Sequence, residues 1–369
     1  MKNSRFKNQM GKALVSRLRI VCCLKLLALG LGALPFSGLA APTQPAKPNI
    51  LFILADDWGW GDLSCHGHPY VKTPNIDRLA REGTDFQRFT VASGVCSPSR
   101  TAIMTGQFPA RYHIDAHFAW VRQNQERNMP DWLDPQAPLL PRFLQQAGYA
   151  TAHYGKWHLA NDMIPDSPLP GQYGYDDYAA FNCAGEQMPV HEDASHAIAF
   201  IEKCHTEGKP FFINLWIHEP HTPFHVVPKY RQRFPELPEA DNIYASVLSH
   251  ADDRIGAVLD TLDRLKLTGN TLVVFTSDNG PARTAKPTPL ELTYDTATGA
   301  GYGIAASKGI TAGRKGYKAA LFEGGIGVPF IARWPGRIAA GRVDTNSLIS
   351  AVDLLPTFCA AAGVNLPAS

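Results

Sequence analysis

Short side chains that carry oxygen follow two predicted buried strands. One pair, Asp56 and Asp57, comes directly after the apolar run 49–55, and a second pair follows the apolar run 271–276. Hard cations such as calcium and magnesium take oxygen ligands of this kind. Three carboxylates brought together would repel one another without a cation, although Asp and Asn also commonly cap separate loops. Taken together, the two strand ends predict a metal site with these ligands: Asp56, Asp57, Asp278 and Asn279.

A cysteine at the start of a predicted helix is the second chemical feature. Cys96 opens the run Cys-Ser-Pro-Ser-Arg, which ends at Arg100, and Pro98 suits the first turn of a helix. A group on Cys96 would then face the helix N-terminus, which favours anions. A buried or disulfide-bonded cysteine, or a nucleophilic thiolate supported by Arg100, fits the same spacing. The spacing alone leaves these alternatives open.

The elements that must position these residues alternate between strands and helices. Apolar runs bounded by polar residues predict buried strands at 49–55, 211–217, 271–276 and 328–332. Capping and periodicity predict helices at 73–83, 242–267 and 353–362. This alternation predicts an α/β fold with a mostly parallel central sheet and helices on both faces. Active sites of such sheets lie outside the carboxyl ends of the strands, and the strand at 211–217 leads there directly into His218 and His221.

The N-terminal residues predict an export signal. A basic stretch precedes an apolar run from Leu26 to Leu39. The sequence there is Gly38-Leu39-Ala40, a small-x-small pattern that predicts cleavage near Ala40. An uncleaved anchor is the alternative, although the run is short for a membrane span of about 20 residues. We expect an exported protein, periplasmic or secreted, with no membrane association after cleavage. The expected segments are a signal peptide, a linker and a catalytic domain, at 1–40, 41–48 and 49–369.

Composition limits the classes of partner. Hydrophobic residues make up 45% of the 369-residue chain and charged residues 18%, which is globular composition. The net charge is +2 and no basic stripe with interleaved aromatics occurs, so we expect no nucleic acid partner. Of seven cysteines, Cys22 and Cys23 fall within the expected signal, which leaves five. An odd number leaves one cysteine unpaired after export, and Cys96 is the candidate. Residues 281–312 are rich in Gly, Pro, Thr and Ala and predict a long surface loop.

The motif from Cys96 to Arg100 resembles the signature of the type I sulfatases in the alkaline phosphatase-like superfamily. Six further blocks match that family in order, between residue 49 and about residue 365. A lone C-x-P-x-R is moderately specific, whereas the ordered set is highly specific. The six blocks are Asp56-Asp57, Thr73-Pro74-Asn75-Ile76-Asp77, Gly155-Lys156-Trp157-His158, Pro220-His221-Thr222-Pro223, Ser277-Asp278-Asn279-Gly280 and Phe322-Glu323-Gly324-Gly325.

The resemblance implies a specific chemistry for Cys96. In the family a maturation enzyme oxidises the motif cysteine to formylglycine, and the aldehyde hydrates to a geminal diol. One hydroxyl attacks sulfur and displaces the substrate alcohol, and the second hydroxyl lets the sulfated intermediate release sulfate. The resemblance therefore implies a sulfuric ester hydrolase whose partners are a formylglycine-generating enzyme and a sulfated small molecule or glycan, with a sulfated carbohydrate expected. Its divalent metal is expected to be calcium, with magnesium as the alternative, and Cys96 joins the metal ligands.

The resemblance also assigns roles to the cationic residues. Arg100 would hold the diol and the metal site together, Lys156 would contact a sulfate oxygen, and His158 would take a proton from the diol. His221 would lie beside the leaving-group oxygen, and Lys318 would bind sulfate and assist the leaving group. The expected catalytic residues are therefore Cys96, Arg100, Lys156, His158, His221 and Lys318, and the expected substrate contacts are Lys156, His221, Lys318 and His218.

Some assignments stay open. The Lys318 assignment slips by one lysine if Lys308 or Lys315 takes its place, and His218 is either a substrate contact or a polar loop residue. His66, His68, His113 and His117 follow no metal spacing.

The chain departs from the family pattern in two ways, and two rival functions remain. Ile326-Gly327 follows Glu-Gly-Gly where the family often has an Arg after one intervening residue. The family's C-terminal antiparallel subdomain is expected to be absent or truncated, which would leave an apolar face exposed. The rivals are a phosphate or phosphonate ester hydrolase of the same superfamily and a non-catalytic protein that binds sulfated glycans.

Overall fold

The fold is described from a computed structural model of the chain, which describes residues 47–284, 289–295 and 299–367. The expected signal peptide at 1–40 and most of the expected linker lie outside the described residues. In the part of the chain that is described, no helix is long and apolar enough to cross a membrane.

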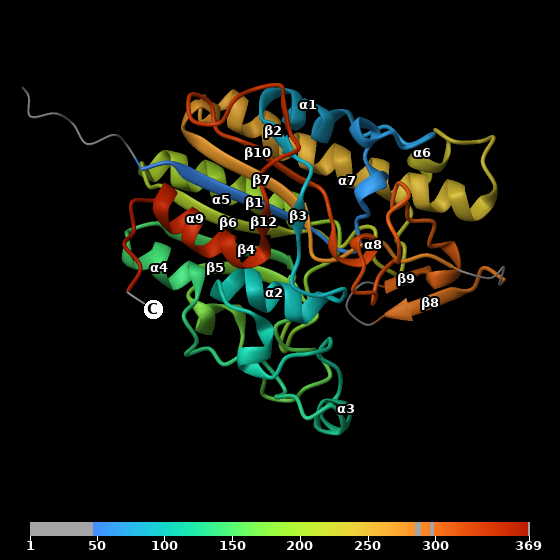
Figure 1. The fold of residues 1–369 in the computed structure, drawn as a ribbon, viewed down its shortest axis with the longest axis horizontal. Helices are drawn as coiled ribbons and strands as arrows, with labels where there is room; N and C mark the ends of the chain where they lie inside the picture. The colour runs from blue at the N-terminus through green and yellow to red at the C-terminus, as the bar shows by residue number, and fades with distance from the viewer. Residues whose placement is uncertain (1–46, 285–288, 296–298, 368–369) are drawn as a thin grey trace, which may run out of the picture. The chain divides into compact units, whose positions relative to one another are not determined.

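An eight-stranded sheet, in the order β11-β2-β10-β7-β1-β6-β4-β5, organises the described residues (Figure 1). The central strand β1 (Asn49–Ala55) pairs in parallel with β7 (Thr271–Ser277) on one side and β6 (Phe211–Trp216) on the other. Beyond β6, the strands β4 (Ala150–Lys156) and β5 (Asp177–Phe181) continue the parallel pairing. The predicted mostly parallel α/β sheet is therefore confirmed, and it includes two parallel strands that we did not predict.

The opposite edge of the sheet changes direction. Strand β10 (Phe330–Arg333) runs antiparallel to both β7 and β2 (Thr84–Phe86). The edge strand β11 (Arg342–Asp344) runs parallel to β2. A separate short parallel pair joins β3 (Phe89–Thr90) to β12 (Ile349–Ser350).

The region predicted as a surface loop at 281–312 contains secondary structure, so that prediction was wrong in part. Strands β8 (Leu292–Asp295) and β9 (Gly299–Tyr302) form an antiparallel pair. Phe224 on the loop after β6 pairs with Tyr302 and holds this hairpin against the main fold. The Gly- and Thr-rich sequence lacks the apolar alternation that marks a half-buried strand. Backbone hydrogen bonds hold the hairpin instead, so the sequence pattern did not predict it.

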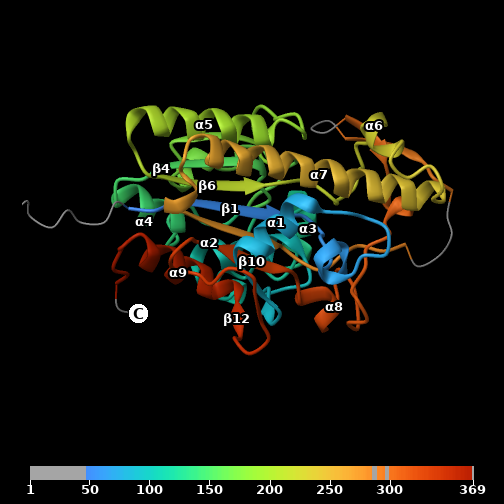
Figure 2. The same cartoon turned by 90° about the horizontal axis from the view of Figure 1, so that it is seen from above.

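Helices cover both faces of the sheet (Figure 2). One face packs against α1 (Pro74–Glu82), α5 (Asp193–Glu207) and α7 (Glu239–Arg264), and the other against α2 (Cys96–Thr105), α4 (Leu140–Gln146) and α9 (Leu354–Ala361). Three short helices complete the set: α3 (Val121–Glu126), α6 (Pro228–Arg231) and α8 (Glu323–Ile326). The helices expected near 73–83, 242–267 and 353–362 are confirmed within a few residues at each end.

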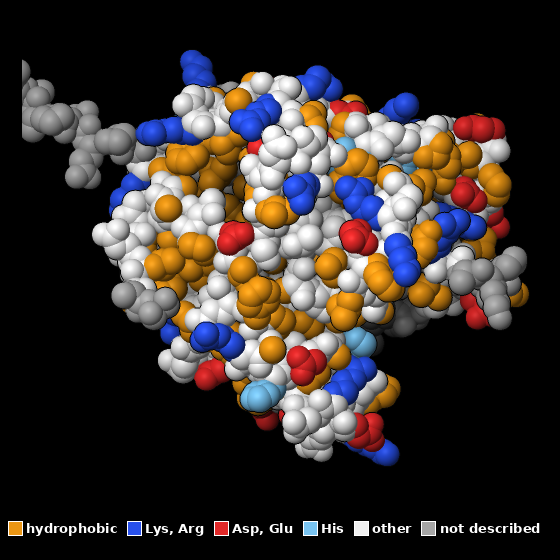
Figure 3. Space-filling model, in the orientation of Figure 1, with side chains coloured by type: hydrophobic (Ala, Val, Ile, Leu, Met, Phe, Trp, Pro, Cys, Tyr) orange, Lys and Arg blue, Asp and Glu red, His pale blue; other side chains and the backbone are white. Residues whose placement is uncertain are grey.

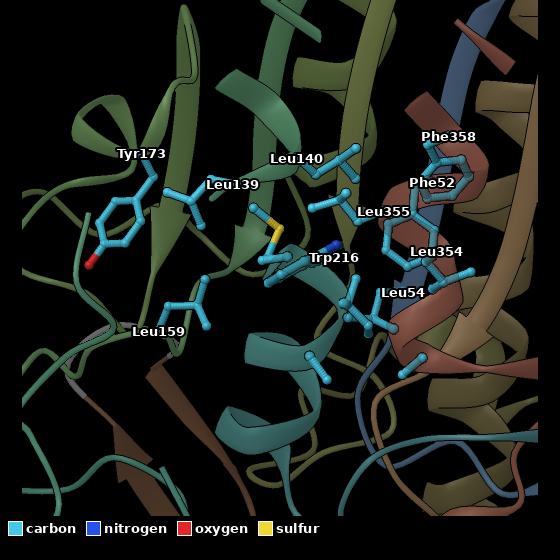
Figure 4. Close-up of a cluster of buried hydrophobic side chains, with 14 of the residues drawn as sticks. Phe52, Leu54, Leu139, Leu140, Leu159, Tyr173, Trp216, Leu354, Leu355 and Phe358 are labelled. Atoms are coloured by element: carbon cyan, nitrogen blue, oxygen red, sulfur yellow. The ribbon is translucent and has the colours of Figure 1, made fainter. Parts of the chain in front are cut away.

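Two hydrophobic clusters fix the helices to the sheet because successive strand residues point to opposite faces. Phe52 and Leu54 of β1 belong to the cluster beneath α2 and α9, whereas Leu51 and Ile53 face α5 and α7. Figure 4 shows Phe52 beside Phe358 of α9, with their ring centroids 5.4 Å apart. Fully burying one such aromatic side chain stabilises a fold by about 1.5–3 kcal/mol, so β1 is held from both sides.

Replacing Phe52 tests this packing. Phe52 is fully buried, so Phe52→Ala should lower the free energy of unfolding by about 3–5 kcal/mol through lost burial and a residual cavity. The matched control is Phe108→Ala, because Phe108 is 60% exposed and should change stability by no more than about 0.5 kcal/mol. Urea denaturation followed by circular dichroism measures both. Equal effects of the two substitutions would contradict the packing described for β1.

Candidate active site

Polar residues gather where four neighbouring parallel strands end. Asp56 follows β1, Asp278 follows β7, Lys156 is the last residue of β4, and His218 comes two residues after β6. The carboxyl ends of these strands lie at one edge because the strands are parallel and adjacent. The fold therefore collects the predicted metal ligands and cations that the chain separates by more than two hundred residues.

Three buried carboxylates form the centre of the site. Oxygen atoms of Asp56, Asp57 and Asp278 lie within 4.8 Å of one another. The Asn279 Nδ2 atom donates a hydrogen bond of 2.7 Å to Asp57 Oδ1. Oδ1 of Asp56 and Oδ1 of Asn279 are buried with no hydrogen-bond partner among the described residues.

This donor set fits a divalent cation. Buried polar atoms in proteins are almost always satisfied, and two unsatisfied oxygens beside three carboxylates are the ligands that calcium or magnesium takes. The fourth predicted ligand, Asn279, lies with the three carboxylates. The carboxylate group and Asn279 therefore stand where the sequence predicted a metal site.

Three cationic side chains balance the three carboxylates. Arg100 donates from Nε and Nη2 to Asp278 Oδ2 at 3.0 and 2.7 Å, and its guanidinium carbon lies 4.9 Å from the Trp216 ring centroid. Lys156 donates to Asp56 Oδ2, and Lys318 donates to Asp57 Oδ2 at 2.7 Å. A divalent cation would add two positive charges to this balanced set, which suits an anionic ligand.

The pKa values of the three carboxyl groups separate according to their partners. Burial raises the pKa of Asp56, but Lys156, His221 and Arg100 outweigh burial and hold it well below its usual range. Burial raises the pKa of Asp57 despite Lys318. Burial and the neighbouring Asp56 charge raise the pKa of Asp278 to about 7. The site without a cation therefore resists full ionisation.

Cys96 lies at the first residue of α2 and belongs to the same site. Its side chain is 3% exposed, and its sulfur lies 3.8 Å from Lys156 Nζ. The sulfur and ligand atoms of Asp56 and His221 are within 4.8 Å of one another. Burial raises the pKa of the thiol to about 11 even though Lys156 and Lys318 lower it. The unmodified thiol is therefore protonated at neutral pH and is a weak nucleophile.

The predicted catalytic histidines differ in how their ring nitrogens are used. His158 Nε2 bonds to the Phe118 carbonyl at 3.1 Å, and its buried Nδ1 has no partner among the described residues. A carbonyl accepts only from a protonated nitrogen, so neutral His158 presents Nδ1 as an acceptor. His221 Nδ1 bonds to the Thr222 carbonyl, and its Nε2 lies 3.9 Å from Asp57 Oδ2.

His218 is more buried than His221. It is 3% exposed, whereas the His221 side chain is 24% exposed. Its Nε2 bonds to the Pro223 carbonyl at 3.0 Å, and the two histidine rings are 5.7 Å apart. Burial lowers the pKa of His218 to about 4. These contacts favour a role in holding the His221 loop over direct contact with a ligand.

Close backbone contacts between glycines bring the block 277–280 against the block 322–325. A Cβ atom on Gly280 would lie 1.9 Å from the Gly324 carbonyl oxygen, so only glycine allows these segments to approach. Gly280 N–H donates to the Gly325 carbonyl at 2.8 Å, and Lys318 N–H donates to the Pro281 carbonyl at 3.0 Å. This packing carries Lys318, and neither Lys308 nor Lys315, to Asp57.

Sequence reasoning missed one residue at the edge of the site. The rings of His117 and His158 are 6.3 Å apart. Burial lowers the pKa of His117 to about 4, and the charges of Arg127, Lys318 and Lys156 add to that effect. The adjacent Phe118 N–H donates to Ser97 Oγ at 3.0 Å, which ties this segment to α2. No spacing signal marks His117, because it reaches the site on a loop and not from a strand end.

The fold is a mostly parallel α/β sheet with a candidate metal centre at the carboxyl ends of its strands. Comparison with known proteins identifies the family. The family model described as Sulfatase matches residues 48–364. The chain belongs to the sulfatase family.

Two curated relatives agree with this assignment. N-acetylgalactosamine-6-sulfatase of Canis lupus familiaris is 33% identical over 372 residues, which cover 90% of this chain and 65% of that protein. Arylsulfatase G of Rattus norvegicus is 30% identical over 402 residues, which cover 93% and 72%. The chain thus spans slightly less than two thirds of the length of the first of these relatives.

A solved structure has the same fold. The crystal structure of Ps i-CgsB in complex with k-i-k-neocarrahexaose superposes with a TM-score of 0.72 and 26% identity over 87% of this chain and 73% of that chain. That protein was crystallised with an oligosaccharide.

The raised pKa of Asp278 predicts a pH effect on stability. A carboxyl group whose pKa is raised in the folded state binds a proton that the unfolded chain releases, so its contribution to the free energy of unfolding falls as pH rises from about 4 to about 7. Asp278→Asn cannot titrate, so in EDTA it should lose less stability than the parent between about pH 5 and about pH 8.

Thermal denaturation at the two pH values measures this difference. Calcium should stabilise the parent more at the higher pH, because the cation and the proton compete for the same oxygens. Parallel pH dependence of the parent and Asp278→Asn would mean that Asp278 keeps an ordinary pKa in the fold.

Proposed function

We propose that this protein hydrolyses sulfate esters, with Cys96 converted to formylglycine and a divalent cation bound by the carboxylate group and Asn279. The observation that carries the proposal is the position of the Cys96 sulfur at a helix N-terminus, within 4.8 Å of Asp56 and His221 ligand atoms. Membership of the sulfatase family supports the reaction class. The relatives are named as sulfatases, and we propose the same activity for this protein.

Conversion of Cys96 agrees with its chemical environment. A buried thiol with a pKa of about 11 is mostly protonated at neutral pH, so it is a poor nucleophile. Formylglycine would supply a hydrated aldehyde with two hydroxyl groups. One would serve as the nucleophile, and the other would allow sulfate to be released afterwards. We propose that a formylglycine-generating enzyme of the host carries out this oxidation.

Calcium is the proposed cation, held by Asp56, Asp57, Asp278, Asn279 and the converted residue 96. When bound, it would act as a Lewis acid that offsets negative charge on oxygen. Arg100 keeps Asp278 in position by its two hydrogen bonds to Oδ2. Lys156 and Lys318 donate to Asp56 and Asp57, Lys156 Nζ lies 3.8 Å from the Cys96 sulfur, and the Lys318 charge also acts on Cys96. Both lysines can therefore bind the oxygens of an anionic ester.

The histidines can move protons at defined atoms. Neutral His158 presents Nδ1 as an acceptor, which suits the removal of a proton from residue 96. Burial, Lys156 and Lys318 hold the pKa of His221 well below its usual range. An anionic ester beside His221 would favour the charged imidazolium, which can donate from Nε2 to the leaving oxygen. His218 would hold the His221 loop.

A sulfated carbohydrate is the proposed substrate. Two observations support it: the names of relatives that act on an amino sugar sulfate, and a structural neighbour crystallised with a neocarrahexaose. We also propose that the protein is exported, periplasmic or secreted, since residues 1–40 carry the pattern of a cleaved signal.

Conversion of Cys96 is tested by peptide mass spectrometry on protein produced with a maturation enzyme. The peptide should lose the thiol sulfur and gain an aldehyde oxygen, and 4-nitrophenyl sulfate should be hydrolysed. Cys96→Ala should abolish this turnover, whereas the control Cys65→Ala should keep it, because Cys65 is exposed and lies outside the site. An unmodified thiol in a preparation that matures a control sulfatase would overturn the proposal.

The assignment of Lys318 has a matched control three residues away. Lys318→Ala should reduce kcat/KM for 4-nitrophenyl sulfate by about 100-fold to 1,000-fold, as expected for loss of a charge that stabilises developing negative oxygen. Lys315→Ala should have little effect, because Lys315 is exposed and its Nζ lies over the Phe322 ring. Equal losses in both variants would assign Lys318 a purely structural role.

The rival ester class is separated by the same assay. Turnover of 4-nitrophenyl phosphate exceeding that of 4-nitrophenyl sulfate would favour a phosphate ester hydrolase of the superfamily. Binding of sulfated oligosaccharides without turnover of either ester would favour a glycan-binding protein.

A further inference from the structure

A basic pocket of about 620 Å³ lies outside the site described above. Its walls include Arg283, Lys308, Arg314 and the side chains of Tyr70 and Tyr317. One carboxylate, Asp241, also lines it. The pocket therefore combines three cations, one anion and two aromatic rings, and none of these groups takes part in the proposed reaction.

The single carboxylate does not neutralise the pocket. Asp241 Oδ1 accepts a hydrogen bond of 3.1 Å from the Tyr70 hydroxyl, and its Oδ2 lies 3.9 Å from Lys308 Nζ. Of the residues that the structure describes, no carboxylate lies within ion-pair distance of Arg283 or Arg314. The charges of Asp85 and Glu323 act on Arg314 from beyond that distance, so both guanidinium groups lack a direct carboxylate partner among these residues.

Aromatic rings hold these two guanidinium groups by their faces. Arg314 lies 3.7 Å from the Trp60 ring centroid, and Arg283 lies 5.5 Å from the Tyr317 ring centroid while donating to the Tyr317 hydroxyl. Stacking reduces the freedom of a guanidinium and leaves N–H groups at its edge for planar recognition of oxygen acceptors. Tyrosine rings add an amphipathic surface that suits a sugar.

The pocket shares its supporting segments with the catalytic lysine. Tyr317 in the pocket wall directly precedes Lys318, whose Nζ donates to Asp57. The Lys318 N–H donates to the carbonyl of Pro281, two residues before Arg283. Segments 281–284 and 308–318 therefore form one wall of the pocket and also hold Lys318 at the carboxylates.

We propose that this pocket binds a second anionic group, a sulfate or a carboxylate, of a glycan whose target sulfate is held at residue 96. The inference rests on the proposed function and deepens it by naming a polyanionic chain as the substrate class. Charge complementarity selects the occupant, because three cations face one carboxylate that Lys308 and Tyr70 already engage. A substrate with one charged group gains nothing from the pocket, whereas a chain with repeated charges gains affinity through it.

The test measures binding in the Cys96→Ala background with calcium present, so that no probe is consumed. Three hexasaccharide probes are used: chondroitin 6-sulfate, which carries sulfates and carboxylates; desulfated chondroitin, which carries carboxylates; and κ-neocarrahexaose, which carries sulfates. Arg283→Gln and Arg314→Gln should each weaken binding of the first probe about tenfold, the scale of a hydrogen bond to a charged group. Arg283→Lys should lose less, because the charge remains.

Lys203→Gln is the matched control, since it removes an exposed cation from α5 on another part of the surface and should leave affinity within about twofold. A loss restricted to the sulfated probes identifies sulfate as the bound group, and a loss that also appears with desulfated chondroitin identifies carboxylate; either supports the pocket. Equal affinities of the pocket variants and Lys203→Gln, or no binding of any probe to the parent, would overturn it.

A second assay keeps the two proposals separable. In protein with Cys96 intact and matured, turnover of 4-nitrophenyl sulfate by the parent tests the proposed function by itself, because this probe has one charged group and gains nothing from the pocket. If sulfate turnover is absent while hexasaccharide binding still depends on Arg283, the proposed function fails and the pocket stands as a glycan-binding site.

Discussion

Mutual repulsion among three buried carboxylates is the constraint on which the rest of the site depends. Asp56, Asp57 and Asp278 approach within 4.8 Å of one another at the end of two parallel strands. Such a group is stable only when positive charge compensates it. Arg100, Lys156 and Lys318 supply three charges, yet two buried oxygens remain unsatisfied. The proposed divalent cation would satisfy these oxygens and would leave a net positive site for an anionic ester.

The architecture serves this constraint in two ways. Parallel pairing of β1 with β6 and β7 places the three carboxylates and the loop that carries His218 and His221 at one edge of the sheet. Close glycine packing at Gly280 and Gly324 then carries Lys318 across to Asp57. The same segments continue into the basic pocket at Arg283 and Tyr317. The chemistry and the proposed recognition of a second charge therefore share one structural support. Figure 3 shows Lys and Arg side chains and apolar patches side by side on one face of the molecule.

The sequence predicted the features that depend on local pattern. Apolar runs marked β1, β6 and β7, and the position of Asp56 and Asp278 after them was sufficient to predict that these residues meet. Strand β4 escaped prediction because His153 and Gly155 interrupt its apolar run, and His153 is buried among the rings of Trp157 and Trp216. His117 and the basic pocket depend on loop contacts between distant segments, for which no local periodicity exists. The hairpin β8–β9 escaped for the same reason.

Calcium binding to the matured protein tests the central claim most directly. Equilibrium dialysis should find one tightly bound calcium per chain, and Asp57→Ala should lose it, since this residue is a proposed ligand and also accepts hydrogen bonds from Lys318 and Asn279. The control Asp241→Ala, a carboxylate in the basic pocket, should retain the ion. Saturable binding that survives Asp57→Ala would place the ion away from Asp57. No saturable binding in the parent would mean that the three cationic side chains alone stabilise the carboxylates. Either result would contradict the account.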